Sequence, residues 1–88
     1  MKEFLTRIGI TDPGSFDKDG NYVIDFDTSR EFNNVFAKLD KSDEVEENEN
    51  ASNITLEMSS IQYMSDNYIL NLTADFSQDI YKLVLTER

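Results

Sequence analysis

The sequence contains no cysteine, no histidine and no tryptophan. Without cysteine there is no disulfide framework, no thiolate nucleophile and no soft-metal site. Without histidine there is no side chain whose ordinary pKa lies near neutrality and could activate a serine. These absences exclude most familiar catalytic centres together with zinc, haem and iron–sulfur sites. We therefore expect a protein that is not an enzyme and that has no metal or cofactor, in a reducing, cytoplasmic setting.

Long hydrophobic runs are also missing, so we expect no membrane-spanning segment. A chain of 88 residues with 39% hydrophobic residues is sufficient for one domain, residues 1–88, with a modest core. Small domains bury only about 60% of their unfolded surface, which leaves little volume for an enclosed substrate pocket. A binding surface is easier to build in this chain than a pocket.

Basic residues are scarce as well. Eighteen acidic residues stand against eight basic ones, which gives a formal net charge of −10. Such a field repels nucleic acid and anionic lipid, and it accelerates encounters with basic surfaces in a salt-dependent way. We expect a basic protein surface as the partner, and neither nucleic acid nor a membrane.

Two helices are predicted by hydrophobic spacing. Phe4, Leu5 and Ile8 recur at helical intervals before Gly9, which is suited to a left-handed cap, and they predict a helix over residues 2–9. A second helix over residues 29–40 begins where Thr28 and a glutamate three residues later stand at the spacing of a capping box.

Four strands are predicted by alternation of hydrophobic and polar residues: 22–26, 54–63 with a β-bulge at Ser59 and Ser60, 68–74 and 81–85. Turn-forming residues separate them. The fold class is therefore α+β in the order α-β-α-β-β-β, with a four-stranded, mainly antiparallel sheet and its helices packed on one face.

Asp17, Asp19 and Asn21 stand at the first three oxygen-ligand positions of an EF-hand calcium loop. However, Tyr22 occupies the position that needs glycine, and Thr28 replaces the bidentate glutamate. A turn leading into the first strand accounts for the same residues. We favour the turn and keep weak calcium binding as an alternative.

Carboxylates are concentrated in two stretches of the chain. Residues 40–53 are predicted to form an acidic loop and contain Asp40, Asp43, Glu44, Glu46, Glu47 and Glu49. A second cluster precedes the 29–40 helix and contains Asp12, Asp17, Asp19, Asp25 and Asp27. Both stretches adjoin the same helix, which allows them to share one face, and we expect the partner-binding site to use these carboxylates. A run of charge can also be a solvated surface that serves only solubility.

In size, charge and mixed fold the chain resembles the small acidic inhibitors that bacteriophages use against host enzymes, such as uracil-DNA glycosylase inhibitors and anti-CRISPR proteins. The resemblance is one of type and transfers no residue. Ten net negative charges on a domain about 25 to 30 Å across approach the charge density of duplex DNA. The leading hypothesis is an inhibitor that mimics nucleic acid and blocks a basic groove. The alternative is a protein-interaction or assembly module, acting through a sheet face or edge, whose acidity is incidental.

Overall fold

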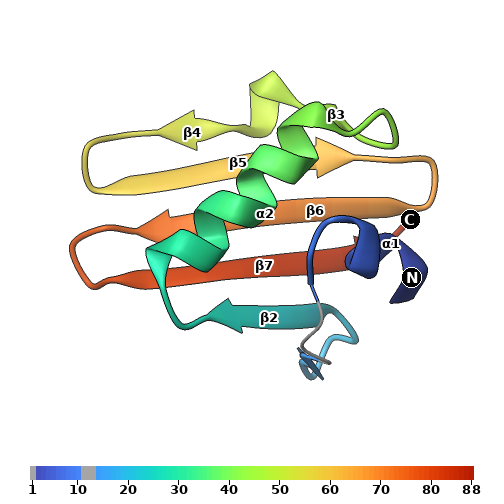
Figure 1. The fold of residues 1–88 in the computed structure, drawn as a ribbon, viewed down its shortest axis with the longest axis horizontal. Coiled ribbons are helices and arrows are strands. Elements are labelled where there is room, and N and C mark those ends of the chain that lie inside the picture. The colour runs from blue at the N-terminus through green and yellow to red at the C-terminus, as the bar shows by residue number, and fades with distance from the viewer. Residues whose placement is uncertain (1, 11–13) are drawn as a thin grey trace.

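One antiparallel sheet with a long helix across one of its faces forms the structure, which is a computed structural model describing residues 2–10 and 14–88 (Figure 1). The elements in chain order are α1 (Lys2–Arg7), β1 (Ser15–Phe16), β2 (Tyr22–Phe26), α2 (Ser29–Lys41), β3 (Glu46–Glu47), the 3-10 turn η1 (Glu49–Ala51), β4 (Asn53–Ile54), β5 (Met58–Met64), β6 (Tyr68–Asp75) and β7 (Ile80–Glu87).

The strand order across the sheet is β1-β2-β7-β6-β5-β3, and β4 also pairs with β5. The last strand, β7, inserts between β2 and β6, so residues near the two ends of the chain are neighbours in the sheet. The β5, β6 and β7 strands form a meander of two hairpins. Strands β1 and β3 therefore lie at opposite edges of the sheet.

The core lies between α2 and the sheet face that α2 covers. Alternation along each long strand places one set of side chains on this face, since successive residues of a strand point to opposite sides. The buried set comprises Tyr22 and Ile24 from β2, Ile61 and Tyr63 from β5, Leu70, Leu72 and Ala74 from β6, and Tyr81, Leu83 and Leu85 from β7. These are the faces that the alternation predicts.

Helix α2 crosses the sheet diagonally, from the end of β2 towards the β3 edge (Figure 1). Its buried residues, Phe32, Val35 and Leu39, recur at i, i+3 and i+7 and form the stripe that meets the sheet. The helix begins at the predicted cap, where the Thr28 hydroxyl accepts a hydrogen bond from the Glu31 N–H at 3.2 Å. The predicted helix over 29–40 is confirmed, with one more residue at its end.

The short helix α1 ends at Arg7, two residues before the predicted end, and Gly9 forms the predicted left-handed cap. Gly9 has a φ of +85°, and the Ile10 N–H donates to the Leu5 carbonyl oxygen while the Gly9 N–H donates to that of Thr6. This is the Schellman arrangement, which needs a left-handed residue at this position. Leu5 and Ile10 are both buried, so the motif turns the chain while keeping it against the core.

The predicted four-stranded sheet with packed helices is wrong. The sheet has seven strands, α2 is the one helix of substantial length, and the described chain is mostly sheet. The missed strands β1, β3 and β4 have two residues each. A strand of two residues is too short to show a period-2 pattern in the sequence. Its pairing depends on the neighbouring strand.

The predicted strand over 54–63 is also wrong in its first half. No bulge joins the segments, because the chain reverses between β4 and β5 and the two strands pair with each other. The Thr55 N–H donates to the Met58 carbonyl oxygen at 2.7 Å, and the Thr55 hydroxyl accepts from the Met58 N–H at 3.0 Å. The shift in alternation phase therefore marks a hairpin.

The predicted acidic loop over residues 40–53 is more ordered than a solvated loop. Asp40 lies in the last turn of α2, and β3, η1 and the start of β4 follow within the segment. The Asn48 N–H donates to the Gln62 carbonyl oxygen, and the Asn48 side-chain amide donates to the Gln62 side chain. These bonds hold the segment against β5.

Candidate protein-binding surfaces

A group of carboxylates that we call the β3-edge cluster lies where α2 ends and the sheet has its edge at β3. All of its members are exposed: Asp40, Asp43, Glu46, Glu47 and Glu49. Glu46 lies opposite Met64 and Glu47 opposite Tyr63, so β3 presents one carboxylate towards each face of the sheet. Within the described ranges, no cluster member forms an ion pair. Their charges are therefore directed to solvent.

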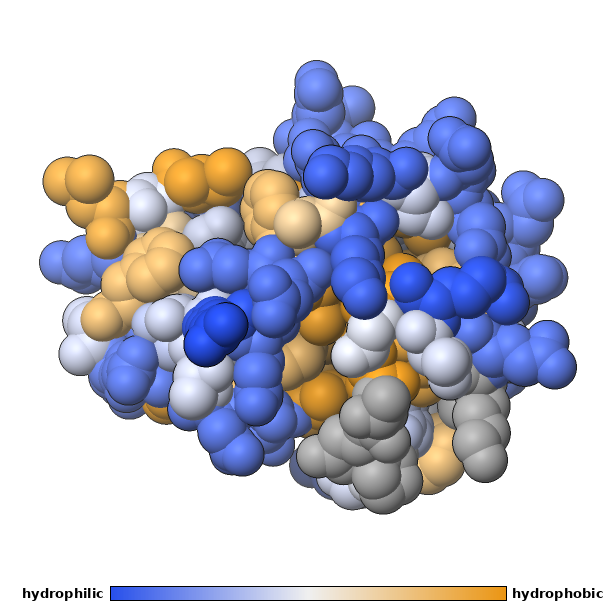
Figure 2. Space-filling model, in the orientation of Figure 1, coloured by the Kyte–Doolittle hydropathy of each residue, from blue (hydrophilic) through white to orange (hydrophobic). Residues whose placement is uncertain are grey.

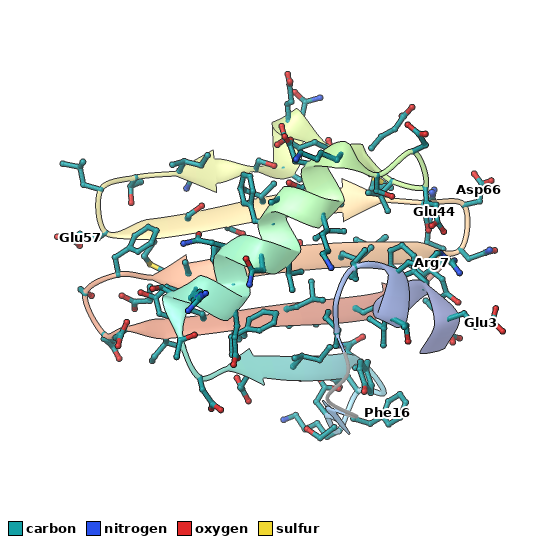
Figure 3. All side chains as sticks on the ribbon, in the orientation of Figure 1. Glu3, Arg7, Phe16, Glu44, Glu57 and Asp66 are labelled. Atoms are coloured by element: carbon teal, nitrogen blue, oxygen red, sulfur yellow. The ribbon has the colours of Figure 1, made fainter. Side chains whose placement is uncertain are left out.

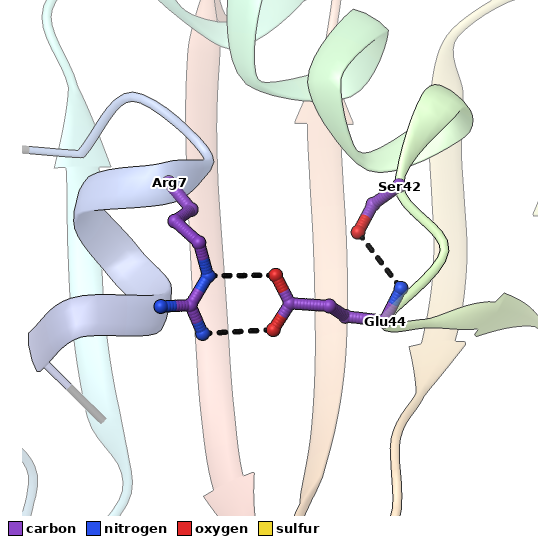
Figure 4. Close-up of polar contacts among 3 residues, drawn as sticks. All are labelled: Arg7, Ser42 and Glu44. Carbon is purple, nitrogen blue, oxygen red and sulfur yellow. Dashed lines mark hydrogen bonds and ion pairs between the residues drawn. The ribbon is translucent and has the colours of Figure 1, made fainter.

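Glu44, the remaining carboxylate predicted in this segment, is already engaged. Its two carboxylate oxygens accept hydrogen bonds from the Arg7 guanidinium at 2.7 and 2.8 Å, and its N–H donates to the Ser42 hydroxyl at 3.1 Å (Figure 4). The bond to Arg7 lowers the pKa of Glu44 and raises that of Arg7. Glu44 thus fastens α1 to the segment after α2 and is not available to a partner in this arrangement.

Beneath the β3 edge, Tyr63 is buried in the core. Burial, and then the nearby carboxylates of Glu47 and Asp40, raise the pKa of Tyr63 to about 12. Its hydroxyl has no hydrogen-bond partner in the part of the chain that the structure describes. An unpaired buried hydroxyl is costly, and the phenolate would be more so. Tyr63 therefore stays neutral.

The second predicted cluster lies at the other edge of the sheet. Asp17 and Asp19 occupy the turn between β1 and β2, Asp25 is on β2, and Asp27 precedes α2. Asp12 is outside the described residues. Strands β2 and β3 are four strand spacings apart, or about 19 Å. The two clusters therefore lie towards opposite edges of the sheet, and a contact centred on one edge uses only one cluster.

Asp17 has a local structural role. One carboxylate oxygen accepts from the Asp19 and Asn21 N–H groups, each at 2.9 Å, and these bonds lower the pKa of Asp17. The EF-hand-like sequence thus forms a turn that the Asp17 carboxylate caps. This is the interpretation that its departures from the calcium-loop pattern favour. Among residues 2–10 and 14–88, no group of three or more carboxylates is gathered as for a metal ion.

A groove of about 870 Å³ lies between α2 and β2 and is hollowed into the face seen in Figure 2. Asp27, Glu31 and Lys38 line its polar rim, and Ile24 and Val35 line its floor. The floor residues are already buried against the core, so they offer little hydrophobic contact to a ligand. We therefore assign the groove no chemistry.

A hydrophobic surface that the sequence pattern does not predict lies at one end of the sheet, and we call it the apolar end. It comprises five exposed side chains, Ile54, Leu56, Met58, Phe76 and Ile80. Hydrophobic side chains over the β4–β5 hairpin are visible at the upper left of Figure 2. In the sequence, the alternation of Ile54, Leu56 and Met58 is typical of the buried face of a strand. These side chains are exposed because the chain reverses between β4 and β5.

Comparison with known proteins gives no family. No protein-family model, curated protein or solved structure matches the chain. None of the helices in the described part of the chain has the length and hydrophobicity needed to cross a bilayer. Function must therefore be inferred from the surfaces themselves.

Proposed function

We propose that this protein is a non-enzymatic acidic binding protein whose β3-edge cluster occupies a basic, nucleic-acid-binding groove of another protein in place of nucleic acid. The observation that carries the proposal is the concentration of exposed, unpaired carboxylates at this edge. The Asn48–Gln62 hydrogen bonds support the edge, so the carboxylates project from ordered backbone.

The size and charge of the molecule support this proposal. Its longest dimension is 31 Å, over which duplex DNA carries about 18 phosphate charges. The chain has a net charge of −10. A basic groove therefore meets a charge density of the same order as that of DNA.

Carboxylates can also replace phosphates in their contact geometry. Both groups accept paired hydrogen bonds from the fork of an arginine guanidinium, and such charge-assisted bonds are stronger than neutral ones. The Arg7–Glu44 pair shows this geometry within the chain, with two parallel contacts of 2.7 and 2.8 Å. Arginines of a partner groove can make the same contacts with the β3-edge cluster.

The first experiment is affinity capture from a bacterial lysate at low and high salt, followed by mass spectrometry. The proposal predicts capture of a nucleic-acid-binding protein that high salt or added duplex DNA releases. Each ion displaced from a basic groove contributes to this salt dependence. Salt-resistant capture that DNA does not affect would contradict the proposal.

A pair of charge-matched variants tests the location of the site. Glu46→Lys with Glu49→Lys reverses two charges in the β3-edge cluster, while Asp19→Lys with Glu87→Lys makes the same change in net charge at exposed positions elsewhere. We expect the first variant to weaken DNA-sensitive capture at least about 100-fold, since two attractive contacts become repulsive. The second should retain most binding. Equal losses would show that net charge matters and this edge does not.

A second candidate is a protein-interaction module whose acidity is incidental. The apolar end favours this candidate, because exposed hydrophobic residues gathered at one end of a sheet are typical of interaction sites. It predicts binding that is insensitive to salt and to both charge reversals but sensitive to substitutions at the apolar end.

A further inference from the structure

Five of the six large hydrophobic side chains exposed in the described part of the chain belong to the apolar end. Leu56 is 99% exposed and Ile54 is 69% exposed. The sixth, Phe16, lies near the β2 edge, away from the hairpin that contains Glu57 (Figure 3). Single exposed hydrophobic residues are ordinary, whereas a gathered set with a polar border marks an interaction surface.

One hydrogen bond joins the two loops of the apolar end, and further hydrogen bonds order each loop. The Phe76 N–H donates to the Glu57 carbonyl oxygen at 2.8 Å, which joins the β6–β7 turn to the β4–β5 turn. Within the first turn, Thr55 bonds to Met58 through both its backbone and its hydroxyl. Within the second, the Asp75 carboxylate accepts from the Ser77 hydroxyl at 2.7 Å. A preorganised surface loses little conformational entropy on binding.

The strand register shows that the apolar end projects as a wedge. Met58, Asp75 and Ile80 lie in one row across β5, β6 and β7, on the sheet face that α2 does not cover. Ile54 lies opposite the buried Ser59 and therefore on the other face. Leu56 is at the turn between them. Hydrophobic groups on both faces of a sheet end fit a concave site better than a flat one.

The charges around the wedge indicate the kind of partner. Glu57 adjoins Leu56 in the turn, and Asp75 and Asp79 flank Phe76 and Ile80 along the chain. Lys82 lies one row further along the uncovered face, directly opposite Asp25. In a symmetric dimer of this chain the same acidic rim would meet itself, and an anionic bilayer would repel it. A partner with lysine or arginine around a hydrophobic centre is complementary.

We propose that the apolar end is an anchor that inserts into a hydrophobic depression, bordered by lysine and arginine, on a partner protein. This inference rests on the proposed function in one respect, since both require a basic partner. The two contacts use different residues at different parts of the sheet, so an experiment can contradict one proposal and leave the other standing.

The test is an NMR titration of the full chain at about 150 mM salt, where long-range attraction is screened beyond about 8 Å. The probe is a short amphipathic helical peptide of leucine and lysine. We expect resonance shifts centred on Leu56, Ile54 and Ile80. A serine–lysine peptide and a leucine–glutamate peptide each lack one of the two required features and should bind at least about tenfold more weakly.

The decisive variant is Leu56→Ser, which removes a fully exposed side chain and should leave the melting temperature unchanged. It should weaken binding of the leucine–lysine peptide about tenfold or more, the effect expected for losing a buried leucine. Phe16→Ser is the matched control, an exposed hydrophobic residue elsewhere, and should change the affinity by less than about twofold.

Three outcomes would contradict the proposal that the apolar end is an anchor. The shifts could centre on the β3-edge cluster with no effect of Leu56→Ser. The free protein could form a dimer that Leu56→Ser dissociates, in which case a second copy covers the surface. Anionic vesicles could bind in a Leu56-dependent way.

The two proposals are separated by comparing variants. Loss of DNA-sensitive capture in Glu46→Lys with Glu49→Lys, with peptide shifts still at the apolar end, supports both. Capture that is unaffected by those reversals contradicts the proposed function alone, and peptide binding that is unaffected by Leu56→Ser contradicts the anchor alone.

Discussion

At the scale of single residues, polar groups in this small domain differ in whether folding has given them partners. Asp17 and Glu44 accept well-formed hydrogen bonds that lower their pKa values, so both support local structure while remaining charged. Tyr63 is the opposite case, a buried hydroxyl without a described partner. Exposed carboxylates such as Glu49 face the solvent. These differences separate residues that support the fold from residues that are available to a partner.

Replacing Tyr63 by phenylalanine should raise the free energy of unfolding by about 1 kcal/mol, because it removes an unpaired hydroxyl from the core without changing the ring. The pKa of Tyr63 is raised to about 12 by folding. Folding therefore disfavours ionisation of Tyr63. The stability of the fold is unaffected by this titration below pH 10, and it falls as the pH rises from 10 towards 12, because the unfolded chain loses the Tyr63 proton more readily. The Tyr63→Phe variant should lose less stability over this alkaline range.

Urea unfolding of the Tyr63→Phe variant at pH 7 and across pH 9 to 12 measures both effects. Tyr68→Phe, at a half-buried position that stacks on Phe4, is the matched control. A lower stability for Tyr63→Phe than for this control at pH 7 would show that the Tyr63 hydroxyl is hydrogen-bonded in solution.

At the scale of elements, local signals located the ends of helices and the faces of long strands. The capping residues Thr28 and Glu31 and the left-handed Gly9 act within a few residues of sequence, so their effects were predicted correctly. The two-residue strands were not predictable, because they exist only through pairing with β2 and β5. The β4–β5 hairpin was mistaken for a bulge for the same reason.

Thr28→Ala should lower the free energy of unfolding by about 1 kcal/mol, since the Glu31 N–H at the start of α2 loses its acceptor. Thermal or urea unfolding provides the measurement. Asn33→Ala, at an exposed position within α2, is the control and should be neutral or slightly stabilising because alanine is the better helix former. Equal stability of Thr28→Ala and wild type would show that water replaces the cap fully.

At the scale of the whole molecule, charge is the dominant property. A net charge of −10 sits on a molecule of 31 × 26 × 25 Å, and Arg7–Glu44 is the one ion pair within the described ranges. Repulsion among the carboxylates therefore opposes the folded state more than ion pairing supports it. A bound basic partner would relieve this repulsion, which links the stability of the fold to its proposed function.

Added sodium chloride should raise the melting temperature at pH 7, because screening weakens repulsion among many carboxylates and only one described attractive pair. Differential scanning calorimetry between about 10 mM and 500 mM salt tests this, across Debye lengths from about 30 Å to below 8 Å. The Glu46→Lys with Glu49→Lys variant should show a smaller rise. A melting temperature that falls with salt would indicate that attractive pairs dominate.

The amino-acid sequence by itself determined the acidic character, the buried faces of the four long strands and the limits of α2, because these depend on composition and on patterns within a few residues. Only the tertiary structure decided where the charges and hydrophobic residues lie. Strand order placed the two acidic clusters at opposite edges of the sheet. The β4–β5 reversal turned Ile54, Leu56 and Met58 from expected core into an exposed surface. Both outcomes depend on pairing between strands, which no local pattern encodes.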